Sequence, residues 1–309
     1  AEKKMDEREL MQSFQQILEN FSQVLTYGGH SFTYRFLNNR WRNYSDADCF
    51  SSEDTADLTL FQSVRQLDIQ KDISPFRHLL SLENTRKATA EAFIRYTRPE
   101  HLDPEALVKC YTSWELSKED TLLLQLKSHH EADMIGLLHL HSLSAYTQFF
   151  RGRFAKVHLC RLEENFCHLA LILETPFPQR VQLANALLSL SLEKDTAHLV
   201  IPVLSGELKY FLPGPVKDYY YLPKEDRAIH RSIACYVDKA YRQKATAATC
   251  YIRQEGIFLP SFDTSLQPTF KKSFDDKQLY ILCDTEKLTS DPAFLRSYIS
   301  SLIKEVASV

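Results

Sequence analysis

The sequence predicts two domains of mixed secondary structure: a helix-rich α/β domain over residues 1–150 and an α+β domain with a mostly antiparallel sheet over residues 151–309. A chain of 309 residues with 44% hydrophobic side chains is long enough to bury two ordinary cores. Apolar residues recur at helical spacing through most of the first half, which is typical of amphipathic helices. After about Arg151, apolar runs alternate with short polar turns, which indicates strands joined by tight connections.

The composition is that of a globular protein, and we expect it to lie in the cytoplasm. The sequence has no long apolar run that would span a membrane and no apolar signal core near its start. The seven cysteines are scattered and include no C-x-x-C pair, which argues against a disulfide framework or a zinc site and favours reduced thiols. With 37 basic and 40 acidic side chains the net charge is −3, so any contact with nucleic acid would depend on local patches.

The first half is predicted to open with a helix, a strand, a turn and a second helix. Apolar residues at helical spacing predict the first helix over residues 6–21, and the short apolar run 23–26 predicts the strand. A glycine pair follows, after which Ser31 is expected to cap a helix that runs to Leu37. The acidic stretch 43–57 is expected to be a solvated loop rather than a metal site, because neighbouring carboxylates repel each other.

Helical spacing continues through the rest of the first half. It predicts helices over residues 58–67, 75–82, 87–94 and 105–111. The strongest helical signal follows. Ser117 and Asp120 have the spacing of a capping box, and leucines on one face then continue to Leu143.

The second half is predicted to be mostly strands. Apolar runs predict strands over residues 157–160, 167–173, 186–192, 198–203, 208–212, 251–259 and 278–283. A helix is predicted over residues 223–240, because Pro223 suits a first helical turn and Ile233 and Tyr236 fall on one apolar face. Residues 292–306 predict a closing helix.

Two short motifs connect these elements to a known chemistry. The string from Tyr27 to Leu37 resembles the second motif of DEDD exonucleases, although Gly28 stands for its asparagine and Thr33 for its metal-binding aspartate. The string from His129 to Asp133 resembles the third motif, His-Asn-x-x-Asp. These two residues are four positions apart and therefore share one helical face.

The order of further segments resembles YprB-type ribonuclease H-like proteins over nearly the whole chain. These segments are Leu79 to Asn84 with Lys87, Glu91 and Arg98 behind them, and in the second half the stretch from Lys217 to Asp226. The resemblance implies a ribonuclease H-like domain of the exonuclease type. It also implies an opening hairpin with an Asp-x-Glu pair, which has no counterpart here, so we expect an N-terminally incomplete domain with an exposed sheet edge.

The resemblance implies two-metal chemistry, in which Mg²⁺ or Mn²⁺ ions held by four carboxylates activate water against a phosphodiester. Asp133 is then the one remaining ligand, with His129 as the general base and Thr33 at the position of a lost ligand. One aspartate cannot hold two hard cations, so we expect this chain to bind no metal. On the residues alone, His129 and Asp133 are better explained as a surface pair that stabilises a helix, and only the family resemblance favours descent from a metal site.

Five residues are candidates for contact with single-stranded nucleic acid: Tyr27, Phe32, Arg40, Tyr220 and Arg227. Tyrosines beside cations can stack on bases and attract phosphates, but tyrosines in a strand also pack half in the core. Three functions therefore remain open: an inactive protein of the exonuclease group, a non-catalytic nucleic-acid-binding or protein-interaction module, and an active nuclease completed by residues upstream. The oligomeric state is not predicted.

Overall fold

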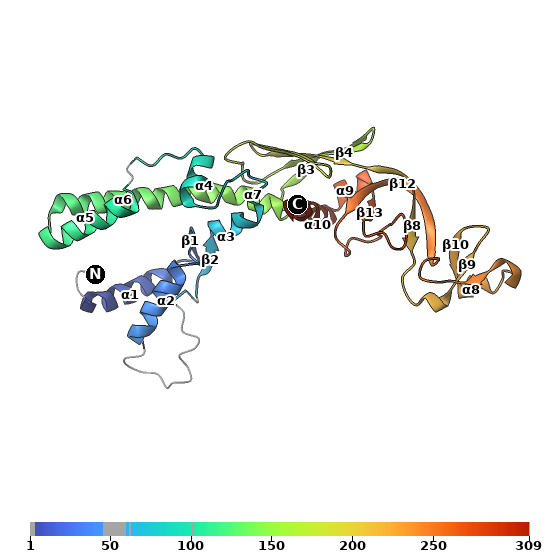
Figure 1. The fold of residues 1–309 in the computed structure, drawn as a ribbon, viewed down its shortest axis with the longest axis horizontal. Helices are drawn as coiled ribbons and strands as arrows, with labels where there is room; N and C mark the ends of the chain where they lie inside the picture. The colour runs from blue at the N-terminus through green and yellow to red at the C-terminus, as the bar shows by residue number, and fades with distance from the viewer. Residues whose placement is uncertain (1–3, 46–59, 62, 100–101, 309) are drawn as a thin grey trace. The chain divides into compact units, whose positions relative to one another are not determined.

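The structure is a computed structural model that describes residues 4–45, 60–61, 63–99 and 102–308. It divides the chain into two compact units, Ala1–Ser144 and Ala145–Val309. Of the acidic stretch 43–57, residues 43–45 belong to a helix and the remainder lies outside the described residues. Figure 1 follows the elements along the chain, and each unit is described by itself.

In the residues that the structure describes, unit 1 combines helices with one pair of strands. Its elements are α1 (Lys4–Leu18), β1 (Gln23–Thr26), α2 (Thr33–Ser45), β2 (Arg65–Asp68), α3 (Ile69–Ile73), η1 (Ser74–Phe76), α4 (Lys87–Phe93), α5 (Pro104–Ser117), α6 (Asp120–Leu140) and η2 (His141–Leu143). The strands β1 and β2 are parallel, with Gln23 opposite Arg65 and Thr26 opposite Asp68. The carboxyl ends of both strands therefore lie side by side, which places the turn after β1 next to Asp68.

The first helix and strand confirm the prediction from the sequence. The apolar face of α1 buries Met11 and Leu18 against Tyr34 of α2 and against Phe61 and Val64. Because these contacts lie on one face, the helical spacing of the apolar residues predicted both the helix and its orientation.

The predicted helix over residues 58–67 is wrong where the structure describes it. Residues 65–68 form β2, and Leu60, Phe61 and Val64 pack as a cluster just ahead of it. The spacing of these apolar residues imitates a helix, but backbone pairing with β1 satisfies the peptide groups of residues 65–68 instead. The predicted helix 75–82 shrinks to the single turn η1, and Ser81 has a positive φ of 53° that ends any helix there.

The predicted capping box at Ser117 is also wrong. Ser117 ends α5, and Lys118 follows with a φ of 55° as a left-handed cap whose N–H donates to Trp114 O. Helix α6 then starts at Asp120 with no side-chain cap. Ser117 and Asp120 thus belong to two helices, and their spacing reflects a helix end followed by a helix start.

Unit 2 confirms the antiparallel sheet. Its elements are α7 (Ser144–Phe150), β3 (Lys156–Glu163), β4 (Phe166–Ile172), β5 (Val181–Ala184), β6 (Ser189–Glu193), β7 (Thr196–Pro202), β8 (Leu204–Phe211), η3 (Val216–Asp218), β9 (Tyr219–Leu222), β10 (Arg227–His230), α8 (Arg231–Ala234), η4 (Lys239–Tyr241), β11 (Gln243–Lys244), β12 (Tyr251–Ser261), β13 (Leu279–Leu282), α9 (Thr285–Ser290) and α10 (Pro292–Ser308). Three sheets have the strand orders β3-β4-β7-β6-β5, β13-β12-β8 and β10-β9-β11. Every pairing in them is antiparallel.

Two connections in the large sheet are two-residue turns. Glu163 pairs with Phe166 and Glu193 with Thr196, so each connection holds two residues. The first turn residues, Glu164 and Lys194, both have a positive φ, as this kind of hairpin requires. The closing helix α10 confirms the prediction over residues 292–306, and it buries Leu295, Tyr298, Ile299, Leu302, Ile303 and Val306.

The predicted helix over residues 223–240 is wrong. Residues 219–230 form the hairpin β9–β10, and only residues 231–234 form α8. Asp226 in the hairpin turn has a φ of 49°, and its carboxylate accepts hydrogen bonds from the hydroxyls of Tyr221 and Tyr251. These contacts from β9 and β12 fix a left-handed residue in the first turn of the expected helix. In the part of the chain that the structure describes, no helix is long and apolar enough to cross a membrane.

Candidate functional site

The turn after β1 is anchored by the buried carboxylate of Asp68. The N–H groups of Gly28 and His30 donate to its two oxygens at 2.8 and 2.9 Å. Burial raises the pKa of such a carboxyl, but these backbone donors outweigh it and hold the pKa of Asp68 below its usual range. Asp68 was not among the residues singled out from the sequence, because the strand that ends in it was interpreted as a helix.

The two glycines of this turn are required by its shape. Gly28 has a φ of 77°, a region that glycine and asparagine reach most easily. Glycine at the position of the motif's asparagine is therefore compatible with the same turn. A Cβ on Gly29 would lie 2.3 Å from the hydroxyl oxygen of Thr26, so only glycine fits there.

Thr33 lies at the start of α2 and is exposed. Its neighbour Tyr34 is buried, and the hydroxyls of Tyr34 and Thr26 lie 3.0 Å apart. The first turn of α2 contains no acidic residue. The motif frame is thus present in three dimensions, with an exposed hydroxyl where the family would place a carboxylate.

Asp133 lies between two cations. Its Oδ1 is 2.7 Å from Lys87 Nζ and 2.8 Å from Arg98 Nη1. Burial raises the pKa of the Asp133 carboxyl, but the hydrogen bond and charge of Lys87 and the charge of Arg98 outweigh it, and the pKa lies below its usual range. The carboxylate is therefore ionised and already neutralised by side chains of its own unit.

Glu91 continues this network into the interior. It is 6% exposed and receives three hydrogen bonds from Arg98, from Nε to both carboxylate oxygens at 3.0 and 3.1 Å and from Nη2 at 2.8 Å. A Cβ on Gly136 would lie 2.9 Å from Glu91 Oε1, so the glycine in α6 makes room for this carboxylate. Arg98 thus links Glu91 of α4 to Asp133 of α6.

His129 is buried, with 8% of its surface exposed. The N–H of Leu102 donates to its Nδ1 at 3.3 Å. A neutral imidazole that accepts at Nδ1 carries its proton on Nε2, so in this arrangement its lone pair is engaged by the backbone. The predicted roles of His129 as a base and of Asp133 as a metal ligand stay predictions.

The donor set does not fit a pair of hard cations. In the described ranges, no three histidine, cysteine, aspartate or glutamate side chains are placed to hold a metal ion. Asp133 offers one carboxylate, whose charge Lys87 and Arg98 offset, and Thr33 offers a hydroxyl. Hard cations such as Mg²⁺ require several charged oxygens.

Most of the residues predicted to contact nucleic acid already interact with other groups of the protein. The hydroxyl of Tyr27 donates to Thr85 O at 2.9 Å, and burial raises its pKa. Arg40 is held by both carboxylate oxygens of Glu7. Phe32 is different, because it is 69% exposed and stacks on the half-exposed Phe36 with ring centroids 5.6 Å apart.

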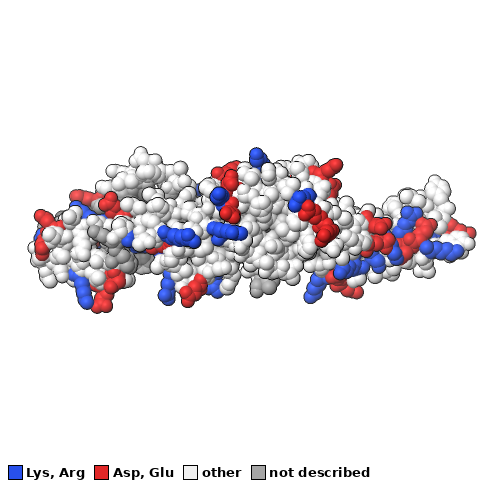
Figure 2. All heavy atoms as spheres, turned by 90° about the horizontal axis from the view of Figure 1, so that it is seen from above, with Lys and Arg blue, Asp and Glu red and all other residues white. Residues whose placement is uncertain are grey.

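The two candidates in unit 2 lie together on the hairpin β9–β10. The Arg242 guanidinium lies 5.0 Å from the centre of the Tyr220 ring, and Arg227 pairs with Glu225 at 2.7 Å. On the face shown in Figure 2, basic and acidic side chains are interspersed, in agreement with a net charge of −3. No broad positive surface is evident on that face.

Exposed aromatic residues next to this hairpin were missed from the sequence. Tyr236 is 89% exposed, Tyr241 is 52% exposed and Ile233 is 59% exposed. Lys224 Nζ lies 4.6 Å from the centre of the Tyr241 ring. The erroneous helix had placed Ile233 and Tyr236 on a buried face, so the aromatic character of this surface was hidden by the wrong secondary structure.

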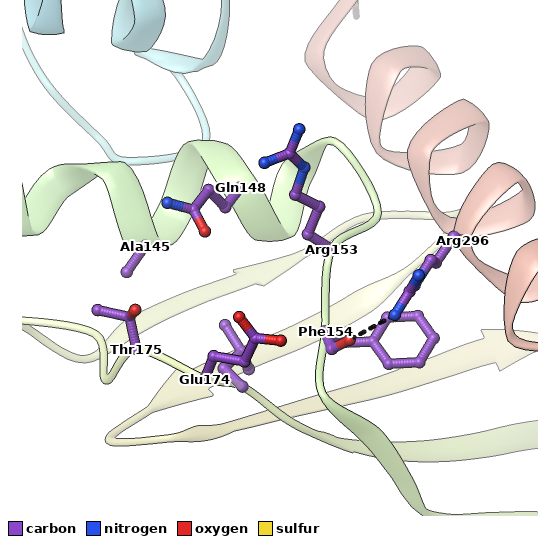
Figure 3. Close-up of a pocket in the computed structure, with 8 residues that line it drawn as sticks. Ala145, Gln148, Arg153, Phe154, Glu174, Thr175 and Arg296 are labelled. Atoms are coloured by element: carbon purple, nitrogen blue, oxygen red, sulfur yellow. Dashed lines mark hydrogen bonds between the residues drawn. The ribbon is translucent and has the colours of Figure 1, made fainter. Parts of the chain in front are cut away.

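A pocket of about 220 Å³ in unit 2 holds none of the predicted site residues. It is lined by Ala145, Gln148, Arg153, Phe154, Leu173, Glu174, Thr175 and Arg296 (Figure 3). Arg296 of α10 donates to Phe154 O at 3.1 Å, and its guanidinium lies over the Phe154 ring. Basic and acidic groups line the pocket together, so its charge does not select one class of ligand.

Comparison with known proteins identifies the class of unit 1. Residues 1–144 match the family model of the RNase H superfamily. No curated protein and no solved structure matches the chain. The N-terminal unit is therefore a ribonuclease H-like domain, and it is followed by a unit built on antiparallel sheets.

Proposed function

We propose that this protein is a nucleic-acid-processing protein of the DEDD exonuclease group, related to the YprB type, and that residues 1–309 are inactive as a nuclease. A domain of the RNase H superfamily suggests nucleic-acid processing as the general role. The single observation that carries the proposed inactivity is the position of Asp133 between Lys87 and Arg98.

The electrostatics of this network oppose catalysis. A metal ion at Asp133 would have to displace two cations and then lie beside them, which costs Coulomb energy at short distance. His129 faces a related difficulty, because its Nδ1 accepts the Leu102 N–H. A general base needs a free lone pair near the attacking water. The same residues instead join α4 to α6, so we propose that the ancestral site now serves the fold.

An exonuclease assay tests this proposal. Purified protein is incubated with 3′-labelled single-stranded and duplex DNA and RNA, each with Mg²⁺ or Mn²⁺. We expect no metal-dependent shortening of any substrate, and the same background for wild type and Asp133→Asn. Metal-stimulated degradation that is present in wild type and lost in Asp133→Asn would contradict the proposal.

A second candidate function is non-catalytic binding of single strands by unit 2. Residues 217–244 hold seven lysines and arginines against four aspartates and glutamates. Three of these four carboxylates are already paired, with Arg231, Arg227 and Arg253. The remaining cations lie in the same segment as the exposed rings of Tyr236 and Tyr241, and exposed tyrosines among cations favour stacking on bases and contact with phosphates.

Fluorescence anisotropy with labelled oligonucleotides tests this candidate. We expect weak binding of single strands at low salt that fades as salt rises, because phosphate contacts release counterions. Tyr236→Ala should weaken it about tenfold, the scale of one lost stacking contact. Tyr111→Ala, an exposed tyrosine of unit 1, is the matched control. Absence of binding at low salt, or an equal loss in both variants, would argue against this surface.

A further inference from the structure

Three cysteine thiols of unit 2 lie together, although the sequence scatters them over more than a hundred residues. Cys160 is in β3, Cys167 is in β4 and Cys283 follows β13. In the pairing of β3 with β4, Cys160 lies opposite Leu169 and Leu162 lies opposite Cys167. Cys160 and Cys167 are therefore diagonal neighbours on one face of the sheet.

Cys167 is the centre of this thiol cluster. Its thiol neighbours the thiols of both Cys160 and Cys283. Cys167 is fully buried, whereas Cys160 and Cys283 are partly exposed. A small solute reaches the two outer thiols from solution, while the central one is accessible only to its neighbours.

A buried tyrosine adds an independent observation. Tyr298 of α10 is fully buried, and its hydroxyl is the one buried side-chain oxygen or nitrogen without a hydrogen-bond partner among the described residues. It lies close enough to Cys167 and Cys283 for a charge on either thiol to raise the pKa of its hydroxyl. A buried hydroxyl without a partner is unfavourable, so a donor held beside two thiols indicates a state of the cluster that offers it an acceptor.

The pKa shifts of the three thiols indicate different roles for them. Hydrogen bonds from Cys167 lower the pKa of the thiols of Cys160 and Cys283. The hydrogen bonds to these neighbours raise the pKa of Cys167, which remains the protonated donor. Because the thiolate is the form that reacts with peroxides, the accessible outer cysteines are the nucleophiles and Cys167 is the resolving thiol.

We propose that Cys160, Cys167 and Cys283 form an oxidation site for hydrogen peroxide, in which Cys167 closes a disulfide with one of its two neighbours. This inference is independent of the function proposed for unit 1.

The reaction balances in two steps. First, an outer thiolate attacks one oxygen of hydrogen peroxide, the O–O bond breaks, and the products are a sulfenic acid and hydroxide, which takes up the proton released by the thiol. The sulfenic oxygen is an acceptor for the Tyr298 hydroxyl. Second, the Cys167 sulfur attacks the sulfenic sulfur, the S–O bond breaks and the leaving hydroxide takes the Cys167 proton. Two thiols and one peroxide thus give one disulfide and two waters.

The full chain is tested by adding one equivalent of hydrogen peroxide to the reduced protein and blocking the remaining thiols with N-ethylmaleimide. We expect the number of titratable thiols to fall from seven to five, because one disulfide consumes two. Peptide mass spectrometry should find Cys167 linked to Cys160 or Cys283. A disulfide that omits Cys167, or one that forms equally fast in the urea-unfolded chain, would overturn the proposal.

Three variants sharpen the test. Cys167→Ser should abolish the disulfide and leave a sulfenic acid that dimedone traps at Cys160 or Cys283. Tyr298→Phe, which removes only the hydroxyl, should slow dimedone labelling several-fold. Cys250→Ser is the matched control, since Cys250 is a buried thiol of the same unit outside the cluster, and it should leave the disulfide unchanged. Unchanged disulfide formation in folded Cys167→Ser would refute the resolving role, and if that variant fails to fold, the peptide linkage in wild type decides.

Discussion

Arg98 is the residue on which the charge network of unit 1 depends. It donates to the buried carboxylate of Glu91 and also contacts Asp133. A buried ion pair contributes little net stability compared with an apolar pair, but removing one partner leaves a buried charge without compensation. The position of Asp133 is thus controlled by a residue outside both exonuclease-like motifs.

Arg98→Ala should lower the free energy of unfolding by about 3 kcal/mol, because it leaves the buried Glu91 carboxylate without its cationic partner. Urea unfolding followed by circular dichroism measures the change. Lys109→Ala is the matched control, since Lys109 forms an exposed pair with Glu105 that contributes about 0.3–0.5 kcal/mol. Equal effects of the two substitutions would show that the Arg98 network contributes no more stability than the exposed pair.

Asp68 gives a prediction about pH. Its pKa is lower in the folded protein than the ordinary value of about 3.9, so the stability it contributes is complete above that value and is lost as the pH falls through the folded pKa. Asp68→Asn should destabilise the protein by about 1–2 kcal/mol at pH 7, and the difference from wild type should shrink below about pH 4. Unfolding free energies of wild type and Asp68→Asn, measured from pH 7 down to low pH, test this prediction. A difference that stays constant down to pH 2 would mean that the carboxylate charge is irrelevant.

At the scale of elements, turns made by residues with positive φ determine where helices and strands end. Lys118 separates α5 from α6, Glu164 and Lys194 close hairpins, and Asp226 replaces the first turn of an expected helix by a hairpin turn. Gly152 is a turn of another kind, because it combines a φ of 79° with close packing. A Cβ there would lie 2.2 Å from the backbone oxygen of Arg296.

Gly152→Ala should therefore destabilise unit 2 more than backbone strain alone would. Gly214→Ala supplies the comparison, since Gly214 also has a positive φ but has open space around its Cβ position. We expect about 1 kcal/mol for Gly214→Ala, and at least twice that for Gly152→Ala, where α10 must shift. Thermal unfolding monitored by near-ultraviolet circular dichroism compares the two. Equal losses of stability would indicate that the turn after α7 and helix α10 move apart without a loss of free energy.

At the scale of the whole molecule, the chain consists of two units, each with its own core. In unit 1 the α1–α2 cluster forms around Met11 and Phe61. In unit 2 helix α10 buries its apolar face, and a separate cluster forms around Leu208, Phe258 and Phe270. Both of these clusters consist of residues of a single unit, as in domains that fold independently.

We therefore expect residues 145–309 to fold when expressed alone. The fragment should show a β-rich circular dichroism spectrum and one cooperative unfolding transition in urea, because its sheets are complete within it. Dispersed amide resonances would confirm a unique fold. A fragment that lacks a cooperative transition would show that unit 2 depends on contacts outside itself.

The local pattern of the sequence was sufficient for elements whose burial agrees with their spacing. The helix α1, the strand β1 and the closing helix α10 fall where periodicity predicts them, because one face of each is buried. It was also sufficient for the ribonuclease H-like character of residues 1–144, which the family match supports. The strand β5 was missed, because four residues with a single fully buried side chain leave too little alternation to detect.

The amino-acid sequence by itself determined the ribonuclease H-like character of residues 1–144, the motif frame around Tyr27 and the spacing of His129 and Asp133. Tertiary structure alone decided that Asp133 is neutralised by Lys87 and Arg98, that Asp68 holds the turn, and that Cys160, Cys167 and Cys283 meet. The physical reason is the range of the interactions. Periodicity and caps act between residues a few positions apart, whereas ion pairs, strand register and thiol contacts join residues that only the folded chain brings together.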